Sequence, residues 1–232
     1  MPVKKTRGRF ITIEGLDGCG KSTQLEKLAG VLRNRGLDIL VTREPGGTPA
    51  GEKIRAVLLD SRTSGVSPYA ELALMFAARA QHVDEIILPA LKNGTWVLCD
   101  RFTDSTEAYQ GSGRKLGSEP VLALHKLLCH GLQPDMTILM ISDVEASVAR
   151  ARRRNLARVP SMAPAAEPRV ADENRFEQES RAFFQRVASA YKAIAKREPK
   201  RVFAVDARRA SEVVHKDIVA AVRKRLAFGH WC

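Results

Sequence analysis

Residues 9–23 read RFITIEGLDGCGKST, and this stretch decides the fold. The apolar and β-branched run over 9–14 predicts a buried strand. The pattern over 21–35, with leucines on one face, predicts a helix that Gly36 ends. Between them the spacing G-x-x-x-x-G-K-S is that of a phosphate-binding loop. Because backbone N–H groups and the positive end of a helix converge there, we predict a site for the phosphates of a nucleoside triphosphate.

Individual side chains of this loop have distinct expected tasks. Lys21 is expected to reach the β- and γ-phosphates, and the Ser22 hydroxyl to bind Mg²⁺. Asp100 follows another apolar strand, and a carboxylate beside such a loop typically belongs to the Mg²⁺ shell. Cys19 stands at the beginning of the helix, a position where a thiol can be reactive. The loop residues predicted to bind ATP are Gly15, Leu16, Asp17, Gly18, Cys19, Gly20, Lys21, Ser22 and Thr23.

Strand and helix patterns alternate along the rest of the chain, which indicates a parallel sheet covered by helices on both faces. We predict one α/β domain over residues 1–232 with a five-stranded parallel sheet. Pro89 is expected to break or kink the long helix that precedes it. The strands are predicted over 9–14, 37–42, 95–99, 136–141 and 200–205, and the further helices over 52–59, 68–88, 120–129, 144–154 and 210–226.

The composition is that of a soluble globular protein: 44% of residues are hydrophobic and 28% charged. No apolar run approaches the roughly 18 residues needed to span a bilayer, and the polar start is unlike a secretory signal. Four scattered cysteines without metal spacing favour reduced thiols, so a cytoplasmic location without membrane contact is expected.

The net charge of +12 raises the alternative of a nucleic-acid-binding protein. The charge is concentrated in the N-terminal tail and around residues 150–158, and neither segment has interleaved aromatic residues for base stacking. A small polyphosphate partner accounts for the arginines equally well, so we predict no nucleic-acid partner. Salt-dependent oligonucleotide binding without ADP production would favour the alternative.

Three further motifs point to a second pocket for an acceptor. REPGGT over 43–48 and DRF over 100–102 each follow a strand, at the sheet edge where ligands bind in α/β proteins. Phe76 and Arg79 are three residues apart on one helix, so they share a face. An aromatic ring and a guanidinium presented together suit a planar base.

The motifs FITIEGLDGCGKST, TREPGGT, LMFAARAQHV, VLCDRFTDSTEAYQGSGR and RFEQES occur in this order over nearly the whole chain. In sequence and spacing they resemble the thymidylate kinase family. The resemblance implies a three-layer P-loop nucleoside-monophosphate-kinase fold. It also implies Mg²⁺-dependent transfer of the γ-phosphoryl group from ATP to dTMP, giving dTDP for dTTP synthesis, by a homodimer packed through the helices around Gln81 and Val121.

The resemblance assigns substrate-binding residues for the acceptor phosphate and the sugar. Arg55 and Arg101 match the arginines that hold the dTMP phosphate, and Glu44 the acidic residue that organises the phosphate and metal region. Asp17 resembles the contact to the sugar 3′-hydroxyl. Tyr109 resembles the residue that crowds the 2′ position and favours deoxyribose.

The same resemblance assigns the thymine contacts. Phe76 matches the residue that stacks on the base, with Met75 as the alternative that depends on helix register. Arg79 matches the residue that bonds a base carbonyl. Thr106 and Gln110 resemble base-reading positions.

Gly18 bears on the source of positive charge at the transferring phosphoryl group. Some family members carry an arginine at this position, whereas others supply the basic group from a lid, and this chain resembles the second, mostly bacterial, type. We expect a lid over 150–176, with an Ala/Pro-rich insertion, from which Arg154 and Arg158 join Lys21 and Arg101 as the catalytic cations. Arg208 resembles part of the loop that brackets the adenine.

The alternative within enzymes is a kinase for another nucleoside monophosphate or for a deoxynucleoside. The pairing of Phe76 with Arg79, together with Tyr109 and Gln110, argues against it. An assay with dTMP, dUMP, dCMP and thymidine as acceptors discriminates between the two.

Overall fold

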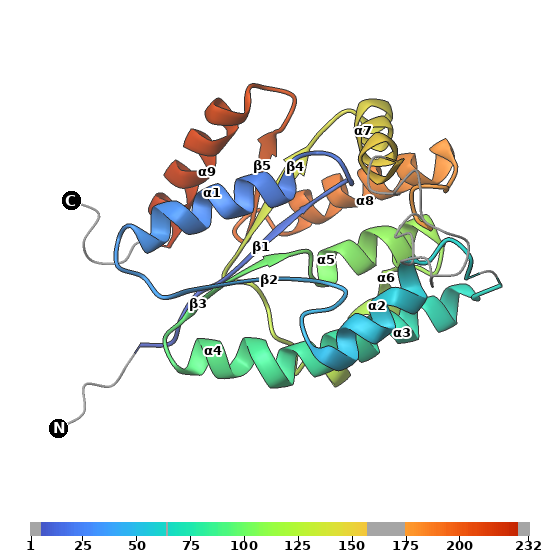
Figure 1. The fold of residues 1–232 in the computed structure, drawn as a ribbon, viewed down its shortest axis with the longest axis horizontal. Coiled ribbons are helices and arrows are strands. Elements are labelled where there is room, and N and C mark those ends of the chain that lie inside the picture. The colour runs from blue at the N-terminus through green and yellow to red at the C-terminus, as the bar shows by residue number, and fades with distance from the viewer. Residues whose placement is uncertain (1–5, 64, 157–174, 227–232) are drawn as a thin grey trace, which may run out of the picture.

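The computed structural model describes residues 6–63, 65–156 and 175–226. Its centre is a five-stranded, all-parallel sheet in the order β2-β3-β1-β4-β5 (Figure 1). All five predicted strands are confirmed, with ends that differ from the prediction by at most two residues. The strands are β1 (Phe10–Gly15), β2 (Ile39–Arg43), β3 (Trp96–Asp100), β4 (Met136–Ile141) and β5 (Val202–Asp206).

Helices on both faces of the sheet complete three layers (Figure 1). The helices predicted with bounds are confirmed, whereas the turns directly after β3 and the helix over 181–197 are not among them. The helices are α1 (Lys21–Arg33), α2 (Pro49–Leu59), α3 (Pro68–His82), the π-helical η1 (Val83–Ile87), α4 (Leu88–Lys92), α5 (Thr103–Thr106), the π-helical η2 (Glu107–Gly113), α6 (Ser118–Leu128), α7 (Val144–Leu156), α8 (Arg181–Arg197) and α9 (Ser211–Arg225).

Pro89 was expected to break or kink the long helix, and of these two outcomes the break does not occur. The chain passes from α3 through η1 into α4 and stays helical to Lys92. A proline lacks the N–H group that an α-helix needs and crowds the preceding turn, and the wider π-helical turn of η1 lies directly before it. The local widening therefore accommodates a residue that would otherwise end the helix.

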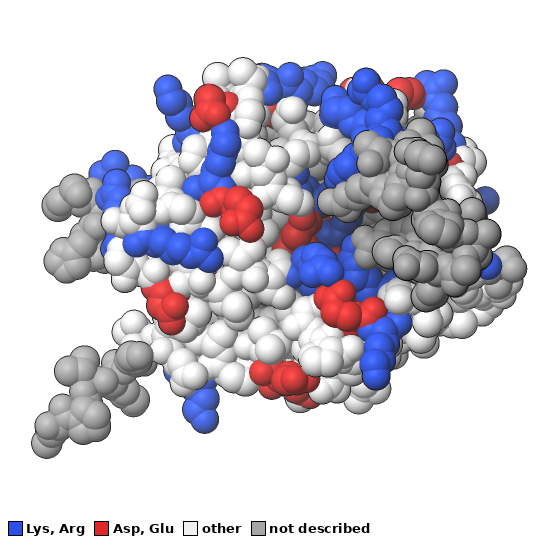
Figure 2. All heavy atoms as spheres, in the orientation of Figure 1, with Lys and Arg blue, Asp and Glu red and all other residues white. Residues whose placement is uncertain are grey.

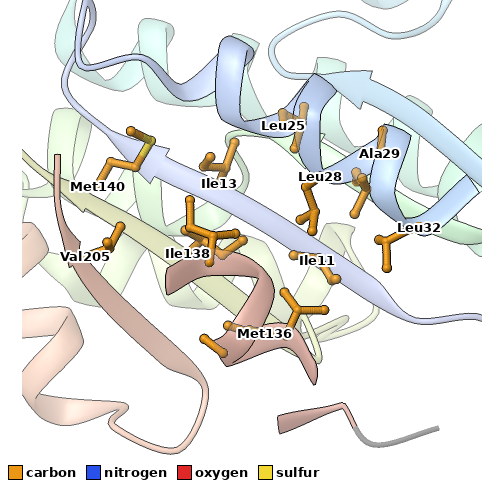
Figure 3. Packing of buried hydrophobic residues seen from close by; sticks show 14 of the residues in the cluster. Ile11, Ile13, Leu25, Leu28, Ala29, Leu32, Met136, Ile138, Met140 and Val205 are labelled. Carbon is orange, nitrogen blue, oxygen red and sulfur yellow. The ribbon is translucent and has the colours of Figure 1, made fainter. Parts of the chain in front are cut away.

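One face of the sheet is covered by α1 and α9. Leu25, Leu28 and Leu32, spaced three and four residues apart on α1, lie over Ile11 and Ile13 of β1 (Figure 3). Each of these five side chains is at least 97% buried, which contributes on the order of 2 kcal/mol apiece. This packing fixes α1 beneath the phosphate loop.

The opposite face is covered by α3, α4, α6 and α8, in two further apolar clusters. Phe10 of β1 meets Phe102, just beyond β3, edge to face with 4.9 Å between ring centroids. Because β2, β3 and β1 are parallel neighbours in the sheet, their carboxyl ends come together at one edge. Ligands bind at this edge in open α/β sheets.

Some predicted features lie outside the described residues. These are Arg158 and most of the insertion between Asn155 and Arg175. In the part of the chain that is described, no helix has the length and apolar character needed to cross a membrane.

Candidate active site

A cavity of about 480 Å³ opens at the carboxyl edge of the sheet. In Figure 2, lysine and arginine side chains gather around the hollow in this face, with acidic groups among them. The cavity brings together the phosphate loop, the segments after β2 and β3, and α3. The predicted site residues that line it are Asp17, Gly18, Gly20, Lys21, Ser22, Thr23, Glu44, Arg55, Arg79, Asp100, Arg101, Thr106, Tyr109, Gln110 and Arg154.

The phosphate loop has the backbone conformation that its glycines allow. Gly15, Gly18 and Gly20 have φ angles of 138°, 76° and 98°, a region that side chains disfavour. Lys21 is buried, and its Nζ donates to the carbonyl oxygens of Gly15 and Leu16 at 3.2 and 3.0 Å. The lysine therefore braces the loop from inside, at the position where phosphates are expected.

Ser22 and Asp100 form a pair of oxygen ligands next to the loop. The Ser22 hydroxyl donates to Oδ2 of Asp100 at 2.8 Å. The second carboxylate oxygen, Oδ1, is buried and has no hydrogen-bond partner among the described residues. A buried oxygen without a partner is costly, and hydroxyl and carboxylate oxygens are the ligands that Mg²⁺ prefers.

Arg101 is the centre of a charged network in the cavity. One nitrogen of its guanidinium donates to Oδ1 of Asp17 at 2.7 Å and to the Tyr109 hydroxyl at 3.3 Å. Tyr109 also donates to Oδ2 of Asp17, at 3.2 Å. Burial alone would raise the pKa of Asp17, but the charges of Arg101 and Lys21 outweigh it and hold that pKa below its ordinary value. The carboxylate is thus kept charged beside the loop.

Arg79 is held from below by two elements. Its Nε donates to Oε2 of Glu44 at 2.6 Å, and one terminal nitrogen donates to the Thr106 hydroxyl at 2.9 Å. Glu44 is also bonded to His82, at 2.9 Å. Its burial favours the neutral acid, yet Arg79 and His82 together hold the pKa of Glu44 below the ordinary value. Arg79 Nη1 is buried and has no partner in the described part of the chain.

A sequence profile described as thymidylate kinase matches residues 13–218, which is most of the chain. The chain belongs to the thymidylate kinase family. It is 47% identical to the thymidylate kinase of Alkalilimnicola ehrlichii over 90% of this chain and 89% of that one. It is also 47% identical to that of Bordetella pertussis over 95% and 97% of the two chains. A solved thymidylate kinase from Ehrlichia chaffeensis matches with a TM-score of 0.70 and 29% identity, covering 93% and 99%.

The residue expected to stack on the base was Phe76, with Met75 as the alternative. The structure favours Met75. Phe76 is fully buried in the core cluster and does not line the cavity, whereas Met75 does. Around an α-helix, side chains four residues apart point in more similar directions than side chains three residues apart. Met75 therefore faces the cavity together with Arg79. Phe76 lies behind Arg79, with its ring centroid 4.9 Å from the guanidinium carbon.

The expectation of a reactive Cys19 thiol is also corrected. Cys19 is 6% exposed and belongs to the core cluster below α1, away from the cavity. Burial raises the pKa of its thiol, despite the nearby charges of Lys21 and Arg101. A protonated, covered thiol is a poor nucleophile, so its place in the thymidylate kinase loop is structural.

Other predicted ATP-binding positions lie around the cavity without lining it. Leu16 is buried in the cluster with α8, and Gly15 sits against the Met140 carbonyl. Arg208 is 68% exposed and bonded to Asp206, outside the cavity. Its assignment to the adenine therefore stays a prediction.

Helix α7 packs directly on the phosphate loop at Gly18. A Cβ built on Gly18 would lie 2.3 Å from the Ser147 carbonyl oxygen and 2.9 Å from the Ala151 nitrogen. The Nε of Arg150 donates to the Gly18 carbonyl at 2.8 Å. Arg154, one turn further along α7, lines the cavity. The missing side chain at position 18 is thus what allows α7 to bring its arginines to the loop.

Sequence reasoning missed a buried network behind Arg101. Glu14 accepts hydrogen bonds from the Ser105 hydroxyl at 2.6 Å, the Tyr191 hydroxyl at 3.0 Å and the Phe102 N–H at 2.7 Å. Ser105 and Tyr191 in turn accept from Arg101, at 2.8 and 3.2 Å. The only signal in the sequence was a glutamate inside an apolar strand, and Tyr191 is too far along the chain to be linked to it.

Glu14 gives a prediction for the pH dependence of stability. Burial, with a smaller contribution from Asp104, raises its pKa from 4.5 to about 7. Because the folded state favours the protonated acid, its contribution to stability is complete below pH 4.5 and is lost as the pH rises through 7. The Glu14→Gln variant does not titrate, so it should gain on the order of 3 kcal/mol relative to the wild type between pH 4.5 and 8. Urea unfolding at several pH values measures this difference, and parallel profiles would contradict it.

Proposed function

We propose that this chain phosphorylates dTMP to dTDP with ATP as the phosphoryl donor, a step in dTTP synthesis. The observation that carries the proposal is the cavity, in which a phosphate-binding loop and a second, arginine-lined pocket are continuous. A phosphotransferase needs both, because donor and acceptor phosphates must be held in line. Membership of the thymidylate kinase family supports dTMP as the acceptor.

The acceptor phosphate is assigned to Arg101 and Arg55. Both line the cavity, and Arg55 donates to the carbonyl of Pro45 at 2.9 Å, which directs it toward the segment after β2. Two guanidinium groups reduce the repulsion between the acceptor anion and ATP. The acceptor is already an anion, so no strong general base is needed. Asp17 and Tyr109 lie on the sugar side in this proposal, where Tyr109 would oppose a 2′-hydroxyl.

The base is assigned to the far end of the cavity, between Met75 and the pair Arg79 and Gln110. Arg79 Nη1, which has no partner among the residues that the structure describes, suits a base carbonyl. A thioether packs well against a flat ring, so Met75 takes the stacking role that the sequence assigned to Phe76.

Two substitutions distinguish these neighbours. Met75→Ala should raise the KM for dTMP about 10-fold, because it removes a wall of the cavity. Phe76→Leu should leave that KM within about threefold but lower the unfolding free energy by on the order of 1–2 kcal/mol, since the ring is core. Steady-state kinetics and thermal unfolding of both variants measure this. If Phe76→Leu raised the KM for dTMP more than Met75→Ala does, Phe76 would be the residue that contacts the base.

Mg²⁺ is assigned to Ser22 and Asp100. The buried Oδ1 of Asp100, which has no hydrogen-bond partner in the described part of the chain, supports this assignment. When bound, the ion neutralises charge on the donor phosphates. Lys21 holds the phosphates within the loop, and Arg154 adds positive charge from α7, with Arg158 as a further candidate. The transition state is loose, so these cations mainly position the reactants and spread charge.

We also propose a cytoplasmic homodimer. The buried, unpaired thiols of Cys19, Cys99 and Cys129 suit a reducing compartment. Val121 itself is fully buried in the core, so the helix that carries it would meet a partner through other side chains. Leu122 and Leu127 on the same helix are 41% and 73% exposed and are better candidates. Light scattering at several concentrations tests the assembly.

A coupled assay of ADP release tests the function. dTMP should be the preferred acceptor over dCMP and thymidine, and product formation should require both ATP and dTMP. ADP release without an acceptor, or preference for another monophosphate, would overturn the proposal.

A further inference from the structure

Glu71 lies outside the cavity but directly behind its base-reading end. It stands in the first turn of α3 and is 1% exposed. Its Oε2 accepts from Arg175 at 2.7 Å and from Arg114 at 3.0 Å. Its Oε1 accepts from Arg114 Nε at 3.0 Å and from the Gln110 Nε2 at 2.8 Å. The two arginines neutralise this buried carboxylate and fix its position.

The bond to Glu71 decides which way the Gln110 amide points. A carboxylate only accepts hydrogen bonds, so the amide must turn its NH₂ group toward Glu71. The reverse orientation would place the amide oxygen against a negative charge. Gln110 is 1% exposed and lines the cavity, and within the described residues its Oε1 accepts no hydrogen bond. The cavity is therefore given an acceptor, not a donor, at this position.

A fixed donor lines the same cavity, and its partner Thr106 lies four residues before Gln110. Arg79 is held by Glu44 and Thr106, and its Nη1 has no partner among the described residues. A donor next to an acceptor matches thymine and uracil, whose O4 accepts and whose N3–H donates. Cytosine carries the opposite pair, an N4 amino donor and an unprotonated N3 acceptor. Cytosine would place its N4 amino donor against the Arg79 donor and its N3 acceptor against the Gln110 oxygen.

We propose that Glu71 is a positioning residue for base specificity, which excludes cytosine by locking the amide of Gln110. The inference rests on the proposed function and extends it to a residue that does not touch the nucleotide. The inference separates two groups of phosphate acceptors. dTMP and dUMP both carry the O4 acceptor and the N3–H donor that fit the site, whereas dCMP does not.

The Glu71→Gln variant tests this directly. Arg175 and Arg114 both donate to the Oε2 position, and Arg114 Nε also reaches it at 3.2 Å, so these arginines keep the oxygen of the new amide there. The NH₂ group then takes the Oε1 position, faces Gln110 and turns the Gln110 oxygen toward it. A donor then faces N3 of the base. The ratio of kcat/KM for dTMP to that for dCMP should fall about 10- to 100-fold, while the ratio for dTMP to dUMP stays within about threefold. A general loss of structure lowers all three alike and moves neither ratio.

Arg114→Gln is the matched control, because it removes an ion pair of Glu71 and leaves the Glu71–Gln110 bond in place. Its thermal stability should fall, and its dTMP to dCMP ratio should stay within about threefold of the wild type. An unchanged ratio in a folded Glu71→Gln variant overturns the inference, as does an equal loss of discrimination in Arg114→Gln. Absence of dTMP turnover in the wild type would instead refute the proposed function.

Gln110→Glu is a second test that retains Glu71. Two adjacent buried carboxyl groups cannot both be charged, so the carboxyl group introduced at position 110 mimics the locked amide only while it is protonated. The kcat/KM for dTMP of this variant should fall at least 10-fold between pH 6 and 8, relative to the wild type at each pH. A pH profile parallel to that of the wild type would contradict the placement of Gln110 against Glu71.

Discussion

Lys21→Ala is expected to lower kcat by roughly 10³-fold or more and to leave the dissociation constant of dTMP within about threefold. Lys21 is the buried cation of the phosphate loop, and its Nζ lies 3.6 Å from Asp17. The alanine variant removes positive charge where the γ-phosphoryl group gathers negative charge during transfer. The acceptor side keeps Arg101, which still pairs with Asp17 at 2.7 Å. Rates of ADP release and calorimetric binding of dTMP measure the two quantities.

Lys27→Ala is the matched control on the same helix. Lys27 points away from the cavity and pairs with Glu212 and Ser211 of α9. Its replacement should change kcat by less than about twofold. Full activity of Lys21→Ala, or an equal loss in Lys27→Ala, would refute the assignment of the loop lysine.

Arg101→Ala is expected to lower kcat/KM for dTMP by about 10³- to 10⁴-fold, with the KM for ATP changed by less than about fivefold. Arg101 is the best-anchored cation of the cavity: Asp17, Ser105, Tyr109 and Tyr191 all bond it. Burial lowers its pKa, but the acidic groups of Asp17, Tyr109 and Tyr191 outweigh burial and raise that pKa well above the ordinary value, so Arg101 stays charged. Its loss removes the acceptor clamp and leaves Asp17 without its main partner.

Arg101→Lys separates charge from geometry. A lysine restores the charge but not the planar fork that bonds a phosphate and the network together. We expect it to recover about 10-fold of the lost kcat/KM, and no more. Complete recovery of kcat/KM in Arg101→Lys would show that charge alone suffices. An unaffected kcat/KM for dTMP in Arg101→Ala would show that Arg101 does not hold the acceptor. Steady-state kinetics with dTMP varied at saturating ATP, and the reverse, give both constants.

The fold was predictable because its signals are local. A strand, the G-x-x-x-x-G-K-S spacing and a helix lie within one stretch of sequence, and the apolar runs over β3 and β4 are typical of buried parallel strands. The turns of α5 and η2 escaped prediction because Ser, Thr and Gly there have weak helix propensity. Contacts with elements far along the chain hold them in place, as the Ser105 bond to Glu14 of β1 does.

The candidate site was predictable where a motif carried it and not where register or distance decided. The choice between Met75 and Phe76 depends on 100° of helix rotation, which an apolar pattern with residues on both sides does not fix. Glu14 and Glu71 support the site through partners far along the chain, Tyr191 and Arg175. A buried glutamate in a strand or helix signals a partner, but the sequence does not say which one.

The contact between Gly18 and α7 constrains how this protein can evolve. An arginine at position 18 would have to displace the Ser147 carbonyl, which stands 2.3 Å from the site of its Cβ. A single substitution at position 18 would therefore be damaging, because it would push away the helix that carries Arg150 and Arg154. Moving the basic group from helix to loop needs compensating changes in both segments together, a mutational path with strong epistasis. We therefore expect random mutagenesis of this chain to return glycine almost alone at position 18.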